Sequence, residues 1–193
     1  MGVSELQSKR RELPLKLDGP AIEGVKLDGP AIEGVPEAQL ERALGIAYRY
    51  LNKRERTAAE VARRLGREGF SPETIAQMLA LLDDEGTVDD RRFARLFIDD
   101  KRALERWGSE RIRRVLIQRG VDSTTVALAL DAGGGELDSR SESERERALA
   151  LLHSRFPERP RNRRDRDRAL GVLLRKGYEP ELAFEVLSAY SRD

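Results

Sequence analysis

The sequence contains no cysteine and only one histidine, His153, among its 193 residues. The missing cysteine excludes disulfides and thiolate metal sites, and it fits the reducing conditions of the cytoplasm. A single histidine excludes His-based catalytic triads and metal sites built from several histidines, and a structural or solvated role is expected for it. No apolar run reaches the length of a signal peptide or a membrane span. These absences predict a soluble, cytoplasmic protein that is not an enzyme and has no catalytic residue, metal or cofactor.

Aromatic residues are also scarce, at 5% of the chain, whereas charged residues reach 37%. A single large aromatic core is therefore not expected. The 36 basic and 35 acidic side chains nearly cancel, which leaves a formal net charge of +1. The overall charge does not indicate nucleic-acid binding, because only local clustering of basic residues would do so.

Two short patterns resemble ligand sites but have the wrong spacing. Five acidic residues lie close together without the alternating intervals of a calcium loop, and helix capping and a solvated turn explain them better: Asp83, Asp84, Glu85, Asp89 and Asp90. The glycines at 133–135 resemble part of a phosphate-binding loop, but no Lys-Ser or Lys-Thr pair follows and no strand precedes them. Residues 133–140 are instead predicted to be a glycine-rich linker.

Residues 1–35 contain the ten-residue sequence KLDGPAIEGV twice in tandem, at 16–25 and 26–35. Each copy includes Asp-Gly-Pro, which favours a turn, and neither copy has an apolar period long enough to bury one face. We therefore expect a flexible N-terminal tail, with a binding peptide as the alternative.

The segment Thr57–Gly86 predicts two short helices joined by a glycine turn. Thr57 and Glu60 have the spacing of a capping box, and Gly69 is placed to end the first helix in a left-handed conformation. Ser71 can cap the second helix. Apolar residues then recur at helical spacing and predict one buried face: Ile75, Met78, Leu79 and Leu82.

Polar residues predict further helix starts along the chain. Asp89 and Ser109 stand in N-cap positions of two helices, and Ser141 and Glu144 repeat the capping-box spacing ahead of a third. No segment has the pattern of a strand.

The glycine turn recurs at Gly120 and Gly177. In each of the three copies a leucine stands four residues before the glycine: Leu65, Leu116 and Leu173. An apolar or aromatic residue directly follows the glycine: Phe70, Val121 and Tyr178. A second leucine stands ten residues after the glycine: Leu79, Leu130 and Leu187. Units of this size gain stability by stacking. The predicted fold is all-α, with three tandem three-helix repeats at 36–86, 87–132 and 141–193 stacked into an elongated, curved array.

Basic side chains recur on the middle helix of each predicted repeat. Nine of them are candidates for binding a partner: Arg63, Arg64, Arg67, Arg111, Arg113, Arg114, Arg119, Arg175 and Lys176. If the units stack in similar orientations, these residues form a basic stripe that suits phosphates or an acidic protein groove. The alternative is that they are solvated helix faces of a highly charged chain. The loop 155–168 adds seven arginines against three acidic residues.

A helix-turn-helix is the alternative interpretation of Thr57–Gly86, with Ile75–Leu82 as the recognition helix. The segment after Val88 is predicted to be helical, which leaves no wing hairpin, and Ile75–Leu82 contains no arginine or lysine. A sequence-specific DNA reader is therefore the less favoured hypothesis.

The segment from Ala43 to Tyr190 resembles the RecX family, the regulators of the RecA recombinase. The resemblance rests most on residues 85–94, EGTVDDRRFA, which are similar to that family's Gly-x-x-x-Asp-x-x-Phe-Ala signature. The residues around Gly69-Phe70 and Gly120-Val121 add to it.

The resemblance implies a regulatory, mainly inhibitory protein that binds the RecA–DNA filament. It implies a limit on filament extension, ATP hydrolysis, strand exchange and co-protease activity, and it implies no catalytic residue. The RecA filament is then the expected partner of a monomer, with direct binding to single- or double-stranded DNA as an open question and no membrane partner. The alternatives are a helical DNA-binding module that acts without a recombinase and a structural scaffold.

Overall fold

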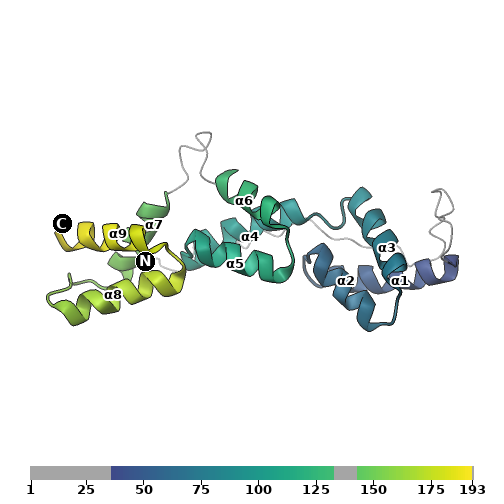
Figure 1. Cartoon of the computed structure of the whole chain (residues 1–193), viewed down its shortest axis with the longest axis horizontal. Coiled ribbons are helices and arrows are strands. Elements are labelled where there is room, and N and C mark those ends of the chain that lie inside the picture. Colours follow the sequence, from purple (N-terminus) through teal and green to yellow (C-terminus); the bar gives the residue numbers. More distant parts are fainter. Residues whose placement is uncertain (1–35, 133–142, 193) are drawn as a thin grey trace, which may run out of the picture.

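The computed structural model describes residues 36–132 and 143–192, and within these two ranges it contains nine α-helices and no strand (Figure 1). The helices form three consecutive units. The first unit comprises α1 (Glu37–Leu51), α2 (Ala58–Arg67) and α3 (Pro72–Asp84). The second comprises α4 (Asp90–Glu105), α5 (Ser109–Arg119) and α6 (Ser123–Ala132), and the third comprises α7 (Glu144–Arg155), α8 (Arg163–Lys176) and α9 (Pro180–Arg192).

The three units follow one another along the long axis of the molecule (Figure 1). In the described part of the chain, the two helices of every pair with extensive contacts belong to the same unit. The predicted all-α fold is confirmed, and the three units are consistent with the predicted three-helix repeats. The N-terminal tail at 1–35 and the linker at 133–140 lie outside the described residues.

Local hydrogen bonds explain where several helices begin. The Thr57 hydroxyl accepts a hydrogen bond from the amide of Glu60 at 3.2 Å, and the Glu60 carboxylate accepts one from the amide of Thr57 at 3.4 Å. This reciprocal pair is the predicted capping box of α2. Ser71 caps α3 and Asp89 caps α4, also as predicted.

Two predicted helix starts were wrong. Gly108 precedes α5 as its N-cap, so Ser109 is the first helical residue and caps nothing with its side chain. The capping box of α7 is formed by Ser143 and Glu146. The sequence SESERE offers the capping-box spacing in two registers, and Glu144 is engaged with another helix, as described below; Ser141 lies outside the described residues.

The repeated glycine turn is confirmed in all three units. Gly69, Gly120 and Gly177 have φ values of 85°, 96° and 87°, in the left-handed region that favours glycine. The amide after each glycine donates to the carbonyl five residues earlier, with N···O distances of 3.4, 3.1 and 3.2 Å: Phe70 to Leu65, Val121 to Leu116 and Tyr178 to Leu173. All three leucines are fully buried, so the turn and the core it closes repeat together.

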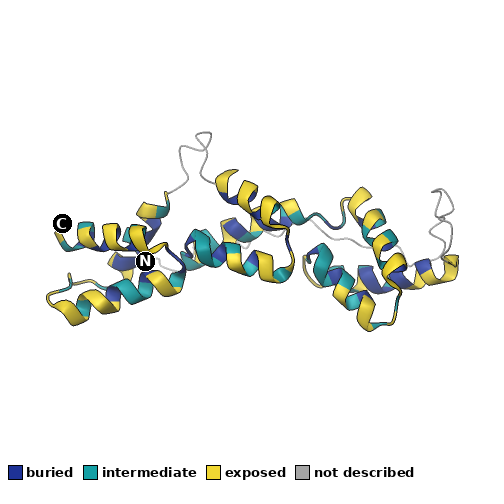
Figure 2. Cartoon of the chain, viewed as in Figure 1, coloured by how far each residue is buried: buried dark blue, intermediate teal, exposed yellow. Residues whose placement is uncertain are grey.

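Each unit has its own hydrophobic core (Figure 2). Fully buried residues at the centre of these cores include Leu65 and Met78 in the first unit, Ile112 and Leu116 in the second, and Leu173 in the third. Because no apolar core among the described residues spans two units, the relative placement of the units depends on contacts at the helix ends. Among the described helices, none is both long enough and apolar enough to cross a membrane.

Candidate partner interface

The nine candidate basic residues lie on the middle helices α2, α5 and α8, and the structure gives them two kinds of surroundings. Four bond to a neighbouring unit: Arg63, Arg111, Arg119 and Lys176. Within the described ranges, the side chains of the other five make no hydrogen bond or ion pair outside their own helix: Arg64, Arg67, Arg113, Arg114 and Arg175. The predicted stripe therefore separates into residues that join units and residues that are available to a partner.

At the first junction, the C-terminal end of α5 meets the N-terminal end of α2. The carbonyl oxygen of Arg119 accepts hydrogen bonds from the Thr57 hydroxyl at 2.9 Å and from the Arg63 guanidinium at 3.1 Å. Thr57 is completely buried there, although it also caps α2. The Thr57 hydroxyl thus caps α2 and also donates a hydrogen bond to the second unit.

The Arg119 side chain reaches back across the first junction. Its Nε and Nη2 atoms each lie 2.9 Å from an oxygen of Glu60, and its guanidinium lies 4.4 Å from the ring centroid of Phe93. The Glu60 side chain is only 14% exposed. Burial alone would raise the pKa of the Glu60 carboxyl, but the hydrogen bonds and charge of Arg119 outweigh it, so the pKa lies below its ordinary value.

At the second junction, the C-terminal end of α8 meets the N-terminal end of α5 in the same way. The amide of Gly108 donates to the carbonyl of Lys176 at 2.9 Å, and the amide of Glu110 donates to the carbonyl of Gly177 at 3.2 Å. The Arg111 guanidinium donates to the carbonyl of Arg175 at 3.0 Å. Two of these three donors are backbone amides, whereas both donors to the carbonyl of Arg119 at the first junction are side chains.

Lys176 and Trp107 complete the second junction. The Lys176 ammonium donates to the carbonyl of Glu105 at 2.7 Å, and burial lowers its pKa although the charge of Glu105 opposes this. Trp107 is buried under the Arg111 guanidinium, which lies 4.0 Å from the ring centroid. Arg106 adopts a left-handed conformation with φ 51°, and its carbonyl accepts a hydrogen bond from the Tyr178 hydroxyl at 2.9 Å.

Each junction contains an acidic residue whose role at the junction could not be predicted from the sequence. The first helical residue of the second unit, Asp90, accepts a hydrogen bond from the amide of Ala58, the first residue of α2, at 2.9 Å. The first helical residue of the third unit, Glu144, accepts from the amide of Ser109, the first residue of α5, at 2.7 Å and from its hydroxyl at 2.8 Å. Each unit therefore caps the middle helix of the unit before it.

The glycine turns also differ in their surroundings. A methyl group at Gly120 would overlap the side chain of Ala59 on α2, and one at Gly177 would overlap Arg111 on α5. At Gly69, the same methyl group would meet nothing within 4 Å. Gly120 and Gly177 are thus required both by the left-handed turn and by the close contact at the junction. Gly69 is required by the turn alone.

The third helix of each unit is a poor candidate for reading DNA bases. In α3, Thr74, Met78 and Leu82 are buried, and neither α3 nor α6 contains an arginine or lysine. The chain enters α4 directly after Val88 and Asp89, so no wing hairpin follows α3. The helix-turn-helix alternative is not supported by this geometry.

The remaining candidates for chemistry lie at the surface. His153 is exposed and lies edge-on to Tyr190, with the ring centroids 5.0 Å apart. Across 36–132 and 143–192, no three acidic or histidine side chains are grouped so as to hold a metal ion. The arrangement offers charged binding surfaces on the outside of the array.

Two family matches cover most of the first two units. Residues 43–82 match the family described as RecX, first three-helix domain, and residues 89–130 match RecX, second three-helix domain. The regulatory protein RecX of Amycolatopsis mediterranei is 31% identical over 158 residues, which cover 82% of this chain and 88% of that protein. The regulatory protein RecX of Leptothrix cholodnii is 31% identical over 143 residues, 74% of this chain and 85% of that protein.

Two solved structures have a similar fold. The crystal structure of RecX from Lactobacillus salivarius superposes with a TM-score of 0.66 at 18% identity, over 79% of this chain and 97% of that one. A crystal structure of regulatory protein RecX superposes with a TM-score of 0.62 at 21% identity, over 78% of this chain and 72% of that one.

Proposed function

Because the chain belongs to the RecX family of regulatory proteins, we propose that it binds the RecA–DNA filament and limits its activity. The expected consequences are shorter filaments, slower ATP hydrolysis, and less strand exchange and co-protease activity. In this role the protein acts as a cytoplasmic monomer through binding alone and catalyses no reaction.

The observation that supports this proposal best is the linear arrangement of the three units (Figure 1). A filament is a polymer that repeats the same surface along its axis. An elongated array can contact such a surface at several points, and linked contacts strengthen one another through their high effective concentration. The two junctions supply the rigidity that this arrangement needs, because each joins helix ends through several hydrogen bonds.

We assign partner contact to the five candidates that remain on the outer surface: Arg64, Arg67, Arg113, Arg114 and Arg175. Arg67, Arg114 and Arg175 are exposed, and each lies on the middle helix of a different unit. The four remaining candidates, Arg63, Arg111, Arg119 and Lys176, hold the units in place and act on the partner only by positioning the others. An anionic or acidic groove is the complementary surface.

The test follows ATP hydrolysis by RecA on single-stranded DNA as this protein is added. We expect the rate to fall, and the triple variant Arg67→Glu, Arg114→Glu, Arg175→Glu to lose most of the effect. A matched control reverses three exposed arginines outside the middle helices, Arg49→Glu, Arg95→Glu, Arg192→Glu, and should still inhibit. A hydrolysis rate that stays constant at saturating wild-type protein would overturn the proposal, and equal loss in both variants would overturn the assigned surface.

A further inference from the structure

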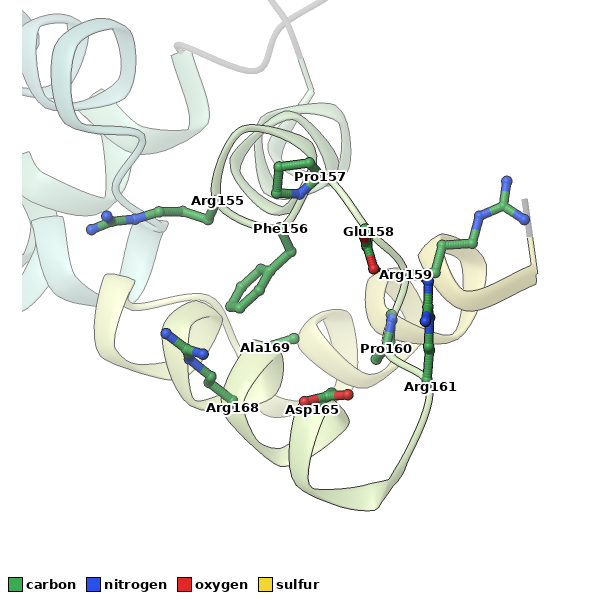
Figure 3. A pocket seen from close by; sticks show the side chains of 10 residues that line it. All are labelled: Arg155, Phe156, Pro157, Glu158, Arg159, Pro160, Arg161, Asp165, Arg168 and Ala169. Carbon is green, nitrogen blue, oxygen red and sulfur yellow. Dashed lines mark ion pairs between the residues drawn. The ribbon is translucent and has the colours of Figure 1, made fainter.

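The third unit contains a pocket of about 420 Å³ between the loop that follows α7 and the N-terminal half of α8 (Figure 3). Its lining combines one aromatic ring with several guanidinium groups and includes Phe156, Arg159, Arg161 and Arg168. We call this site the Phe156 pocket.

Hydrogen bonds hold the pocket loop in place. The buried Tyr190 hydroxyl on α9 donates to the carbonyl of Phe156 and lies 3.5 Å from the carbonyl of Glu158. The amide of Phe156 donates to the carbonyl of Leu152 at 2.8 Å, which continues α7 to the edge of the pocket. The Asn162 side chain caps α8 on the other side by accepting from the amide of Asp165 at 2.9 Å. The pocket is therefore formed before any ligand arrives.

The Phe156 pocket carries a net positive charge, because four arginines line it together with two acidic residues, Glu158 and Asp165. Across the described ranges, Arg155, Arg159 and Arg168 form no ion pair. Arg161 pairs with Glu158 at 3.0 Å, but both side chains are more than three-quarters exposed, at 79% and 77%. A pair this exposed is screened by water and exchanges readily for another anion. The contrast is Arg119, which is 22% exposed and held by both oxygens of Glu60.

The Phe156 ring restricts which kinds of anionic ligand fit the pocket. Phe156 is half-buried and points into the pocket, with the Arg168 guanidinium 5.8 Å from its ring centroid (Figure 3). An aromatic face flanked by arginines can stack an unpaired base while the arginines contact the adjoining phosphates. Bases in a duplex are paired and stacked, so they cannot lie against this ring. A free phosphate would leave the ring without a partner, and a peptide that contains only acidic side chains has no flat ring to stack against it.

We propose that the Phe156 pocket binds single-stranded nucleic acid, with a base against Phe156 and backbone phosphates on Arg159 and Arg168. The inference rests on this pocket alone and does not require the recombinase. The contact is independent of sequence, because every base has a flat face and the phosphates are uniform. It gives the third unit a role distinct from the arginines of the middle helices.

The test measures fluorescence anisotropy of a labelled oligothymidine with the full-length protein and no recombinase. We expect saturable binding whose affinity falls with salt, with a log–log slope of about −0.7 for each phosphate contact on a single strand. Arg168→Glu and Arg159→Glu should each weaken binding about tenfold and make the slope shallower. Phe156→Leu should weaken binding about tenfold at an unchanged slope, because it removes stacking and no charge.

Arg164→Glu is the matched control. It makes the same charge change in the first turn of the same helix, its side chain is exposed, and it does not line the pocket. Its affinity should stay within about twofold of wild type. Far-ultraviolet circular dichroism and thermal melts of every variant report whether the third unit still folds.

Several outcomes would overturn the inference. They are no binding by wild type, equal losses for Arg164→Glu and Arg168→Glu, full affinity for a folded Phe156→Leu variant, or competition by a duplex or polyglutamate as strong as that by the single strand. Any of these results leaves the effect on RecA hydrolysis to its own assay, so the failure of one proposal is distinguishable from the failure of the other.

Discussion

At the first junction the carbonyl of Arg119 is held by the side chains of Thr57 and Arg63, whereas at the second the carbonyl of Lys176 is held by the backbone amide of Gly108. The helix ends that meet are equivalent, and in both cases an acidic residue from the next unit caps the middle helix. The chemistry differs because side-chain groups hold the carbonyl of Arg119 at the first junction, whereas the second adds two direct backbone–backbone hydrogen bonds to its side-chain contacts.

This difference teaches how each junction can fail. A side-chain junction depends on charge and on the identity of a few residues, so it responds to pH and to polar substitutions. The direct backbone–backbone bonds of the second junction also require close approach, so this junction responds to added atoms at Gly108 and Gly177.

The largest effect is expected at the glycine turns. Gly177→Ala should lower the free energy of unfolding by about 3 kcal/mol, because it adds left-handed strain and an overlap with Arg111. Gly69→Ala, with a similar φ but open space around it, should cost only the strain, about 1 kcal/mol. Urea denaturation of the two variants measures the difference. Equal costs would show that close approach does not hold the second junction.

Arg119 and Lys176 directly precede Gly120 and Gly177. Removing the basic side chain should lower the free energy of unfolding more at Arg119, in the first junction, than at Lys176, in the second. Arg119→Ala leaves the largely buried Glu60 carboxylate without its ion-pair partner and should cost about 2–3 kcal/mol. Lys176→Ala removes one hydrogen bond to a carbonyl and should cost about 1 kcal/mol. The same denaturation experiment compares them, and a larger cost for Lys176→Ala would contradict the division into side-chain and backbone junctions.

The two capping acids offer a finer comparison. Glu144→Ala removes acceptors for the amide and the hydroxyl of Ser109, whereas Asp90→Ala removes an acceptor for one amide, that of Ala58. Each lost hydrogen bond costs about 1 kcal/mol, so Glu144→Ala should be the more destabilising of the two. Thermal melts of both variants at one pH provide the measurement. The reverse order would mean that the third unit is not anchored through Glu144.

The smallest effect is expected from pH. Folding lowers the pKa of Glu60 below its ordinary value of 4.5, so the unfolded chain takes up this proton at a higher pH than the folded protein. The stability that Glu60 contributes is therefore present above pH 4.5 and is lost as the pH falls below it. Comparing wild type with Glu60→Gln across this range isolates the contribution. Parallel stability curves for the two proteins would contradict it.

The sequence predicts the structural features that depend on residues close together in the chain. Thr57 and Glu60 form their capping box because the two side chains are three residues apart, and the three glycine turns follow from the spacing of leucine and glycine in each repeat. These local signals specify the helices, the cores and the number of units. The all-α array could therefore be derived before any coordinate was known.

The junctions could not be derived in that way, because their partners are far apart in the chain. Glu60 and Arg119 are separated by 59 positions, and nothing local distinguishes Arg119, which joins units, from Arg114, which is exposed. Ser109 has the composition of an N-cap, but the third unit supplies Glu144 instead. Stacking also decides which of the nine basic residues bond to a neighbouring unit and which do not. The sequence therefore predicts the candidate residues but does not separate these two groups.

The proposal that this protein limits RecA filaments is tested most directly by filament length. RecA filaments grown on long single-stranded DNA, with and without the protein, can be measured by electron microscopy. The account predicts shorter filaments with wild type and near-normal lengths with the triple variant Arg67→Glu, Arg114→Glu, Arg175→Glu. Filaments of unchanged length at saturating wild-type protein would contradict it.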